Sequence, residues 1–234
     1  MSASLEQQRP EVLTELGQKT LRDLMRCWFD FERRLARVPV IRRLDTGEFS
    51  IEDYRRLLLN LRPQVVEGSR WISRCASSFD RDHADIRSVI IGHAFDEHRD
   101  YEILEHDYVA SGGDLATIRT QDRNIGSEIL HAYLMYRATQ PNPTCLLGAM
   151  WIIEGLGDKM ARDWAARIEA LTGGDGGNTR FMRYHAANDE SHMDKFYALL
   201  DRACTDPRDS RSIVMTARIV ARLYALQLEE IELV

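Results

Sequence analysis

Helical periodicity dominates the pattern of hydrophobic and polar positions along the chain. Apolar residues recur at spacings of three and four, and strand-like alternation is almost absent. The pattern predicts a first helix over residues 16–37. The apolar face of this helix comprises Leu21, Leu24, Met25, Trp28 and Phe29.

Turn signals divide the rest of the chain into six further predicted helices. Glycine, proline, asparagine and aspartate cluster at 45–50, 111–114, 140–143 and 173–177. The predicted helices are 50–77, 84–109, 123–138, 144–171, 179–203 and 209–229. Ser50 to Asp53 resembles a capping box at the start of the helix 50–77, and Pro63 is expected to kink this helix or to mark a local break in it. Seven helices with short connections predict one all-α bundle domain over residues 1–234, with its core at about 16–230.

Composition excludes several classes of protein. The net charge is −6, and the absence of a basic run argues against nucleic-acid binding. No stretch approaches 18 apolar residues, and the N-terminus lacks the pattern of a signal peptide. The four cysteines include no CxxC pair, which argues against a thiolate metal site and a disulfide scaffold. We therefore expect a cytoplasmic protein that binds neither nucleic acid nor membranes.

The most informative motif is the triplet His185, Asp189 and His192. Offsets of four and then three residues place these side chains on one stripe of the predicted helix 179–203. Two imidazoles and a carboxylate are ligands typical of non-haem iron. The alternative is a solvated helix face, which the polar neighbours Asn188 and Asp194 would suit.

Two carboxylates lie within apolar stretches of other helices. Glu154 lies in LLGAMWIIEGL, and Glu67 follows two valines and precedes Trp71 by one helical turn. Burial of an unpaired carboxylate costs several kcal/mol, so each should bind a metal or pair with a cation. Arg70 and Arg162 are available as cation partners. Small residues around Glu154, at positions 148, 149, 155 and 157, would let another helix or a ligand approach closely.

The predicted helix 84–109 offers His93, His98 and His106 as possible further ligands. Glu102 is one turn from His98 and from His106, so these three share a face, whereas Glu97 lies roughly opposite His106. With His98 taken first and Glu102 and His106 as substitutes, four helices supply six candidate metal ligands. These are Glu67, His98, Glu154, His185, Asp189 and His192. Bundles hold carboxylate-bridged pairs of iron or manganese in this way.

These residues resemble the pattern of the haem-oxygenase-like diiron oxidases and oxygenases. In that family a Glu on one core helix is followed by a His on the next helix. A second Glu follows that His by about 55 residues, and the motif His-x3-Asp-x2-His begins about 30 residues after the second Glu. Here Glu154 follows His98 by 56 residues, and His185 follows Glu154 by 31. The family spacing favours His98 over His106. One departure is that the additional Glu of many members is matched only by Asp96 and Glu97, with Glu102 as a substitute.

The resemblance implies the seven-helix fold of haem oxygenase and of the thiaminase-II family. It also implies two Fe(II) ions, with manganese as an alternative, O2 as co-substrate and no haem. The expected enzyme oxidises a small amino- or acyl-type carboxylate in specialised metabolism, by N-oxygenation, oxidative carbon–carbon cleavage, decarboxylation or desaturation. Only the metal ligands are expected to be catalytic. An external electron donor and a homodimer are compatible with this expectation.

Two other functional interpretations of the sequence stay open. One is a metal-free enzyme on the same fold, either a thiaminase-II-like hydrolase, for which Cys145 is the best-placed nucleophile, or a cofactorless oxidase. The other is a non-catalytic helical binding protein whose polar residues pair with one another. The sequence does not identify the substrate, because a fatty chain needs an apolar tunnel and an amino acid needs an arginine partner.

Overall fold

A computed structural model describes residues 13–174 and 176–233, with positions 190, 191 and 233 described by their backbone only. Residues 1–12, 175 and 234 lie outside the described part. The N-terminal segment that lacks a signal-peptide pattern and both ends of the predicted domain 1–234 fall among these residues. Every regular element within the described residues is helical. This confirms the prediction of an all-α fold.

The order of the helices follows the predicted order, with additional short elements. The α-helices are α1 (Glu15–Leu35), α2 (Pro39–Thr46), α3 (Ile51–Val65), α4 (Gly68–Ser77), α5 (Ala84–Asp96), α6 (Asp100–Ala110), α7 (Leu115–Thr120), α8 (Ile125–Ala138), α9 (Leu147–Leu156), α10 (Arg162–Thr172), α11 (Arg180–Ala203) and α12 (Pro207–Glu229). Two 3₁₀ turns, Thr144–Leu146 and Ile231–Leu233, precede α9 and follow α12. A π-helical turn, Gly157–Ala161, joins α9 to α10.

Three of the helices predicted from the sequence are interrupted, the first of them close to Pro63, where a kink or local break is expected. The helix predicted over 50–77 divides at Val66 and Glu67, just beyond Pro63, which cannot donate a backbone hydrogen bond. The helix predicted over 84–109 divides between α5 and α6, and that predicted over 144–171 divides at the π-helical turn. The short helices α2 and α7 were not predicted.

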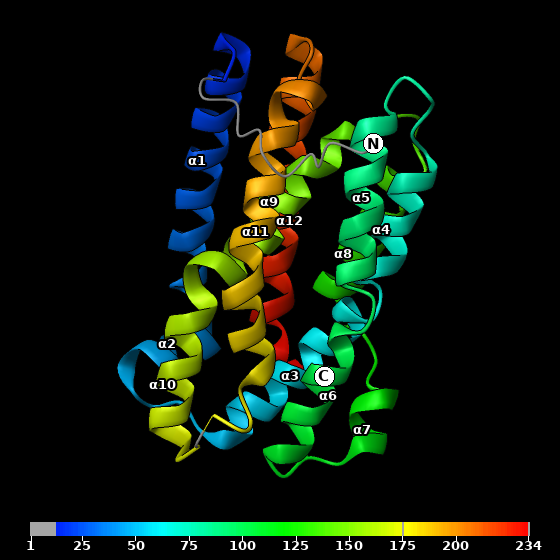
Figure 1. Ribbon diagram of the computed structural model, residues 1–234. Coiled ribbons are helices and arrows are strands. Elements are labelled where there is room, and N and C mark those ends of the chain that lie inside the picture. The colour runs from blue at the N-terminus through cyan, green and yellow to red at the C-terminus, as the bar shows by residue number, and fades with distance from the viewer. Residues whose placement is uncertain (1–12, 175, 234) are drawn as a thin grey trace.

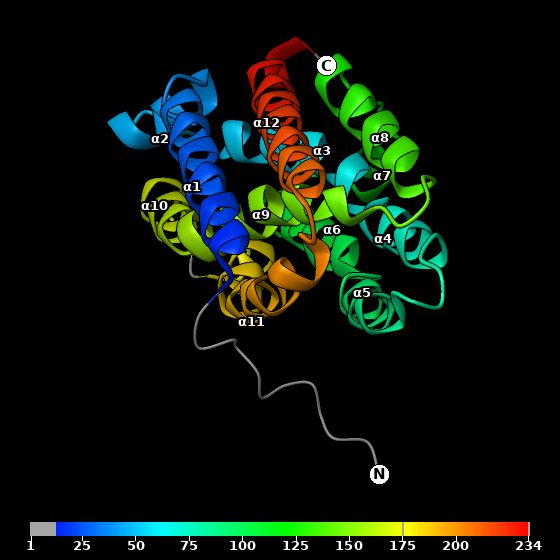
Figure 2. The same ribbon diagram turned by 90° about the horizontal axis from the view of Figure 1, so that it is seen from above.

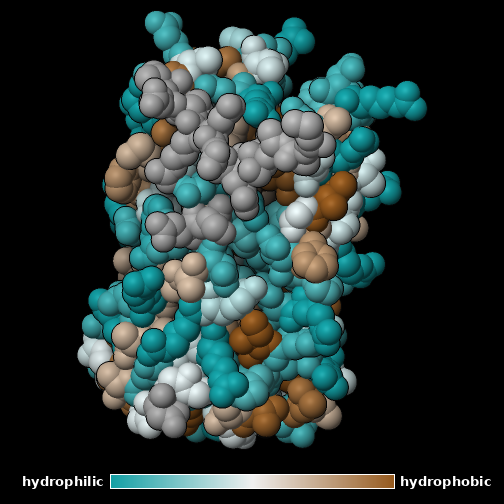
Figure 3. All heavy atoms as spheres, viewed as in Figure 1, coloured by the Kyte–Doolittle hydropathy of each residue, from teal (hydrophilic) through white to brown (hydrophobic). Residues whose placement is uncertain are grey.

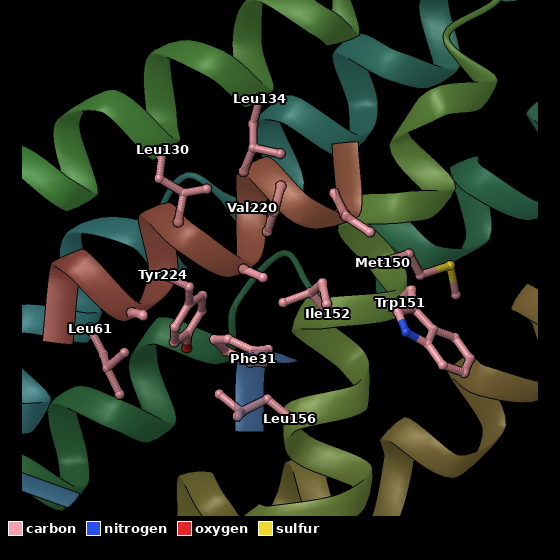
Figure 4. Packing of buried hydrophobic residues seen from close by; sticks show 14 of the residues in the cluster. Phe31, Leu61, Leu130, Leu134, Met150, Trp151, Ile152, Leu156, Val220 and Tyr224 are labelled. Carbon is pink, nitrogen blue, oxygen red and sulfur yellow. The ribbon is translucent and has the colours of Figure 1, made fainter. Parts of the chain in front are cut away.

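Helix α12 is the centre of the bundle. It packs against α1, α8 and α9, and the two perpendicular views show it surrounded by these helices (Figures 1 and 2). Large apolar side chains fill the space between them, including Phe31, Ile152 and Val220 (Figure 4). The indole N–H of Trp151 donates a 3.0 Å hydrogen bond to the carbonyl of Leu24. The packed core and this hydrogen bond therefore fix the positions of α1, α9 and α12 relative to one another.

Local signals explain where several helices begin and end. The hydroxyl of Ser50 accepts from the backbone of Asp53, whose carboxylate accepts from the backbone of Ser50, which confirms the predicted capping box. Helix α10 ends at Gly173, whose φ of 73° lies in the left-handed region. A Cβ on Gly148 would overlap the carbonyl of Ile213, so this glycine permits the close packing of α9 on α12.

On the face shown in Figure 3, hydrophilic residues predominate outside the grey atoms, and hydrophobic residues form small separate patches. Among the helices of the described part of the chain, none is both long and apolar enough to cross a membrane.

Candidate metal centre

Four helices, α5, α6, α9 and α11, place histidines and carboxylates together inside the bundle. The triplet His185, Asp189 and His192 lies along one face of α11, as its spacing predicts. Nδ1 of His185 lies 3.1 Å from Oδ1 of Asp189. Nδ1 of His192 lies 2.9 Å from Oε2 of Glu154, which α9 contributes. The sequence-predicted residues on α9 and α11 therefore form one contiguous cluster.

The first group of potential ligands consists of His93, Glu97, Glu154 and His192. One nitrogen or oxygen atom from each lies within 4.8 Å of those from the other three. Glu154 is the centre of this group, because its second oxygen lies 3.3 Å from Nε2 of His93. Nδ1 of His192 lies 3.6 Å from Oε1 of Glu97. Two histidines and two carboxylates thus surround one small space.

The second group consists of Glu97, Asp100 and His185, whose ligand atoms are also within 4.8 Å of one another. Nε2 of His185 lies 3.6 Å from Oδ2 of Asp100. Asp189 joins the two groups, since it contacts His185 and lies 3.7 Å from Nδ1 of His192. Glu97 belongs to both groups. Two adjacent ligand sets that share a carboxylate are the arrangement of a dinuclear centre.

The break between α5 and α6 creates half of this arrangement. His93 and Glu97 are four residues apart at the end of α5, so they face the same side. The chain then leaves the helix and re-enters it at Asp100, the first residue of α6. This turn brings Asp100 beside Glu97, so that one carboxylate oxygen of each lies within 4.8 Å of the other.

Gly157 lets the π-helical turn approach α11 at the centre. A Cβ at this position would overlap Oδ2 of Asp189 and lie 3.2 Å from Cβ of His185. Because only glycine lacks this atom, Gly157 is the residue that fits between the two ligands. π-Helical turns within α-helices are frequently found at functional sites. The close approach that the small residues near Glu154 predict is therefore present here.

Burial and crowding shift the pKa values of the centre. Burial, together with the nearby Glu154 carboxylate, raises the pKa of Glu97 to about 9. Burial also raises the pKa of Asp189 to about 6 and that of Asp100 above its usual range. Burial opposes ionisation of Glu154 too, but His93 and His192 hold its pKa well below the usual range. Burial would lower the pKa of His185, but Asp189 and the other acids outweigh it and raise the value to about 9.

The donor set fits a pair of cations. Three polar atoms of the centre are buried and have no hydrogen-bond partner among the described residues. They are Nε2 of His185, Oδ2 of Asp100 and Nδ1 of His93. Buried polar atoms are rarely left in this way in folded proteins. Four acids packed together also repel one another when ionised, which two divalent cations would neutralise. Imidazole and carboxylate are suitable ligands for iron and manganese.

The structure does not bring Glu67 and His98 to this cluster. Both carboxylate oxygens of Glu67 accept from Arg70 at 2.8 Å, so this acid pairs with the cation that the sequence offered as its alternative partner. Arg123 lies 3.7 Å from the same carboxylate. His98 is exposed in the turn between α5 and α6, where its Nδ1 lies 2.7 Å from the carbonyl of Phe95.

The two substitutes also lie away from the cluster. Glu102 is exposed and pairs with Arg99 at 2.7 Å. His106 is exposed on α6, and its Nδ1 lies 3.5 Å from Asp107. Both residues follow the break in the helix, so the phase expected for a continuous helix over 84–109 does not apply to them.

The sequence placed His93 and Glu97 on the predicted helix 84–109, but neither was selected as a ligand, and Asp100 was not considered. The four-residue spacing of His93 and Glu97 was a usable signal, because it repeats the spacing of His185 and Asp189. Asp100 carried no such signal, because its place depends on the turn between α5 and α6.

An apolar cavity of about 110 Å³ adjoins the centre. Glu97, Glu154, His185 and Asp189 form one side of it. The side chains of Glu97 and His185 each keep 14% of their surface exposed. The remaining walls are mostly aliphatic and aromatic, and Tyr224 and Gln64 are the neutral polar side chains among them. No lysine or arginine lines the cavity within the described residues.

No protein-family model and no curated protein sequence matches the chain. Solved structures do resemble it. A domain of unknown function with a haem oxygenase-like fold from Shewanella denitrificans superimposes with a TM-score of 0.84 at 17% identity, over 92% of this chain and 91% of that one. A TenA homologue from Pseudomonas syringae pv. tomato gives a TM-score of 0.70 at 12% identity, over 100% and 98% of the two chains.

A TenA homologue from P. horikoshii gives a TM-score of 0.67 at 13% identity, over 94% of this chain and 98% of that one. Identities this low relate the folds alone. Together with the helix order, they show that this protein has the all-α fold shared by haem oxygenase-like domains and TenA homologues.

Proposed function

We propose that the protein is a non-haem diiron enzyme that activates O2 to oxidise a small apolar substrate. The observation that carries this proposal is the sharing of Glu97 between two adjacent ligand sets. Two Fe(II) ions, or manganese as an alternative, would be held by the residues of the cluster. These are His93, Glu97, Asp100, Glu154, His185, Asp189 and His192. When bound, such a metal pair supplies electrons for the reduction of dioxygen.

Charge supports two divalent ions rather than one. Glu97, Asp100, Glu154 and Asp189 carry four negative charges when ionised, and neutral histidines add none. Two divalent cations balance that charge within a buried space, where an unbalanced charge costs several kcal/mol. One cation would leave a proton or a net charge on the acids, of which Glu97 already has a raised pKa.

The cavity supports an apolar substrate. Its walls would exclude water and hold a hydrocarbon body, while the hydroxyl of Tyr224 and the amide of Gln64 could orient one neutral polar group. The carboxylate of a free amino acid would lack an arginine or lysine partner there. Of the two substrate classes that the sequence suggests, an acyl-type compound suits the apolar walls better, because it carries one charged group and a free amino acid carries two.

The fold alone is equally consistent with a metal-free enzyme of the thiaminase-II type. That chemistry requires a cysteine nucleophile in the cavity. None of the four cysteines is among the residues that line it, and all four are buried. Cys145, the nucleophile that the sequence suggested, instead lies 3.2 Å from the guanidinium of Arg137. The ligand cluster thus favours the metalloenzyme.

Anaerobic loading with Fe(II) followed by exposure to O2 tests this function. The proposal predicts bound iron, consumption of O2 and a transient absorption in the visible range. The variant Glu97→Ala should lose these signals, and Glu67→Gln should retain them. Wild-type protein that binds no iron would contradict the proposal, and activity that depends on a cysteine in metal-free protein would support the hydrolase instead.

A further inference from the structure

A basic groove lies between α1 and α12, apart from the metal centre. The groove is a hollow of about 710 Å³, within the range of small-molecule sites. Five arginines line it against two acids, although the chain as a whole has a net charge of −6. The five arginines are Arg33, Arg34, Arg37, Arg218 and Arg222. The two helices run side by side in both ribbon views (Figures 1 and 2).

Most of these arginines lack an acidic partner. Arg33 pairs with Asp30 on the same helix. Across the described part of the chain, no carboxylate forms an ion pair with the other four. Arg218 and Arg222 are one helical turn apart on α12, and Arg34 and Arg37 lie three residues apart at the C-terminal end of α1. Like charges this close repel one another. An anion bound between the helices would remove this repulsion.

The floor of the groove is apolar. Phe31, Ile219 and Ala221 line it beneath the guanidinium groups, and Met215 is exposed at its side. Arginine binds phosphate through paired N–H donors and stacks on flat apolar groups. The groove therefore suits a ligand that has a phosphate group and an apolar or aromatic body.

Phe31 separates this groove from the metal centre. Its ring contacts that of Tyr224 edge to face, with the centroids 6.2 Å apart (Figure 4). Tyr224 lines the cavity beside the metal ligands, whereas Phe31 lines the groove. The two spaces thus lie on opposite sides of one aromatic pair and share no lining residue.

We propose that the groove between α1 and α12 is a binding site for an organic phosphate, distinct from the diiron site and independent of it. The phosphate would lie among Arg34, Arg37, Arg218 and Arg222, and the organic body would lie on Phe31 and Ile219. A nucleotide and an inorganic phosphate ion share the chemistry of this anion, and the test below separates them.

Calorimetric titration of the purified full-length protein with adenosine monophosphate, adenosine and inorganic phosphate tests the proposal. We expect saturable binding of the monophosphate and none of adenosine. Binding of inorganic phosphate that is as tight as that of the nucleotide would also support the anion site and would show that the organic body contributes nothing. Failure of both phosphates at millimolar concentrations, or equal binding of adenosine, would overturn the proposal.

Paired arginine variants locate the site. Arg218→Gln with Arg222→Gln should weaken binding of the monophosphate at least tenfold. Arg208→Gln with Arg211→Gln, two exposed arginines on the first turns of the same helix, should leave it unchanged. An equal loss in both double variants would mean only non-specific attraction and would overturn the site. Both double variants should match the wild type in circular dichroism and in iron content. A loss of phosphate binding with unchanged iron content would then concern the groove alone and not the proposed metal site.

Discussion

Gly157 has no room for a side chain because Asp189 occupies the position of its missing Cβ. We predict that Gly157→Ala displaces Asp189 and the adjacent His185. The overlap should destabilise the fold by about 1–3 kcal/mol and weaken Fe(II) binding by about tenfold or more. Thermal unfolding and anaerobic Fe(II) titration measure the two effects.

Gly92→Ala is the matched control for this substitution. Gly92 lies in α5, and a Cβ there would meet nothing within 4 Å. Alanine should stabilise this position by about 0.4–1 kcal/mol and leave iron binding intact. If Gly157→Ala behaves in the same way, the close contact at the centre does not exist.

His93 and His98 should differ in their effect on metal content. His93 is buried beside Glu154, whereas His98 is exposed and bonded to its own turn. We predict that His93→Ala removes at least one of two bound irons and that His98→Ala removes none. Metal analysis after anaerobic loading and desalting distinguishes them. Loss of iron from the His98 variant alone would restore the ligand set that the sequence suggested.

Glu105 should make stability depend on acid pH. Its buried carboxylate accepts from Arg62 and Arg119 at 2.7–3.0 Å. Burial opposes ionisation, but the two arginines outweigh it and lower the pKa of Glu105. Because the folded pKa is below the unfolded value of about 4.3, this contribution is complete above that pH and is lost as the pH falls through the folded value.

We therefore predict that Glu105→Gln destabilises the protein by about 1–3 kcal/mol at neutral pH. The difference from wild type should shrink as the pH falls below about 4. Urea unfolding at a series of pH values measures it. A difference that stays constant down to the acid limit would mean that the charge of Glu105 contributes nothing.

Asp206 should stabilise the central helix from its N-terminus. Its carboxylate accepts from the backbone N–H groups of Arg208 and Asp209, and Asp209 completes the capping box. Asp206→Ala should cost about 1 kcal/mol, and Asp206→Asn should cost less because asparagine also caps helices. Equal losses in chemical denaturation would show that the charge of Asp206, rather than its capping bond, is what stabilises α12.

Periodicity and turn residues were sufficient to predict the all-α fold and most helix ends. They indicated the break near Pro63 but could not predict the other two breaks within long helices. The break between α5 and α6 carries no proline or glycine between Glu97 and Arg99, so nothing local distinguishes it from continuous helix. Tertiary packing decides it, which single-sequence patterns do not contain.

The same limit explains the outcome for the candidate ligands. Glu154 lies in α9, before the π-helical turn, and the triplet lies in the continuous helix α11, so in both cases phase and hydrophobic context identify an inward side chain. His98 was assigned from the family spacing, but it lies in the turn after α5 and is exposed. Glu67 has an apolar context like that of Glu154, but it lies at a helix boundary next to Arg70 and pairs with it.

The most direct test of the central claim is the number of Fe(II) ions that the protein binds in an anaerobic equilibrium titration, with Glu97→Ala measured alongside. Two ions per chain in the wild type, and weakened binding of both in the variant, is the predicted result, because Glu97 belongs to both ligand sets. No specific binding, or two ions that bind equally well without Glu97, would contradict a carboxylate-bridged centre.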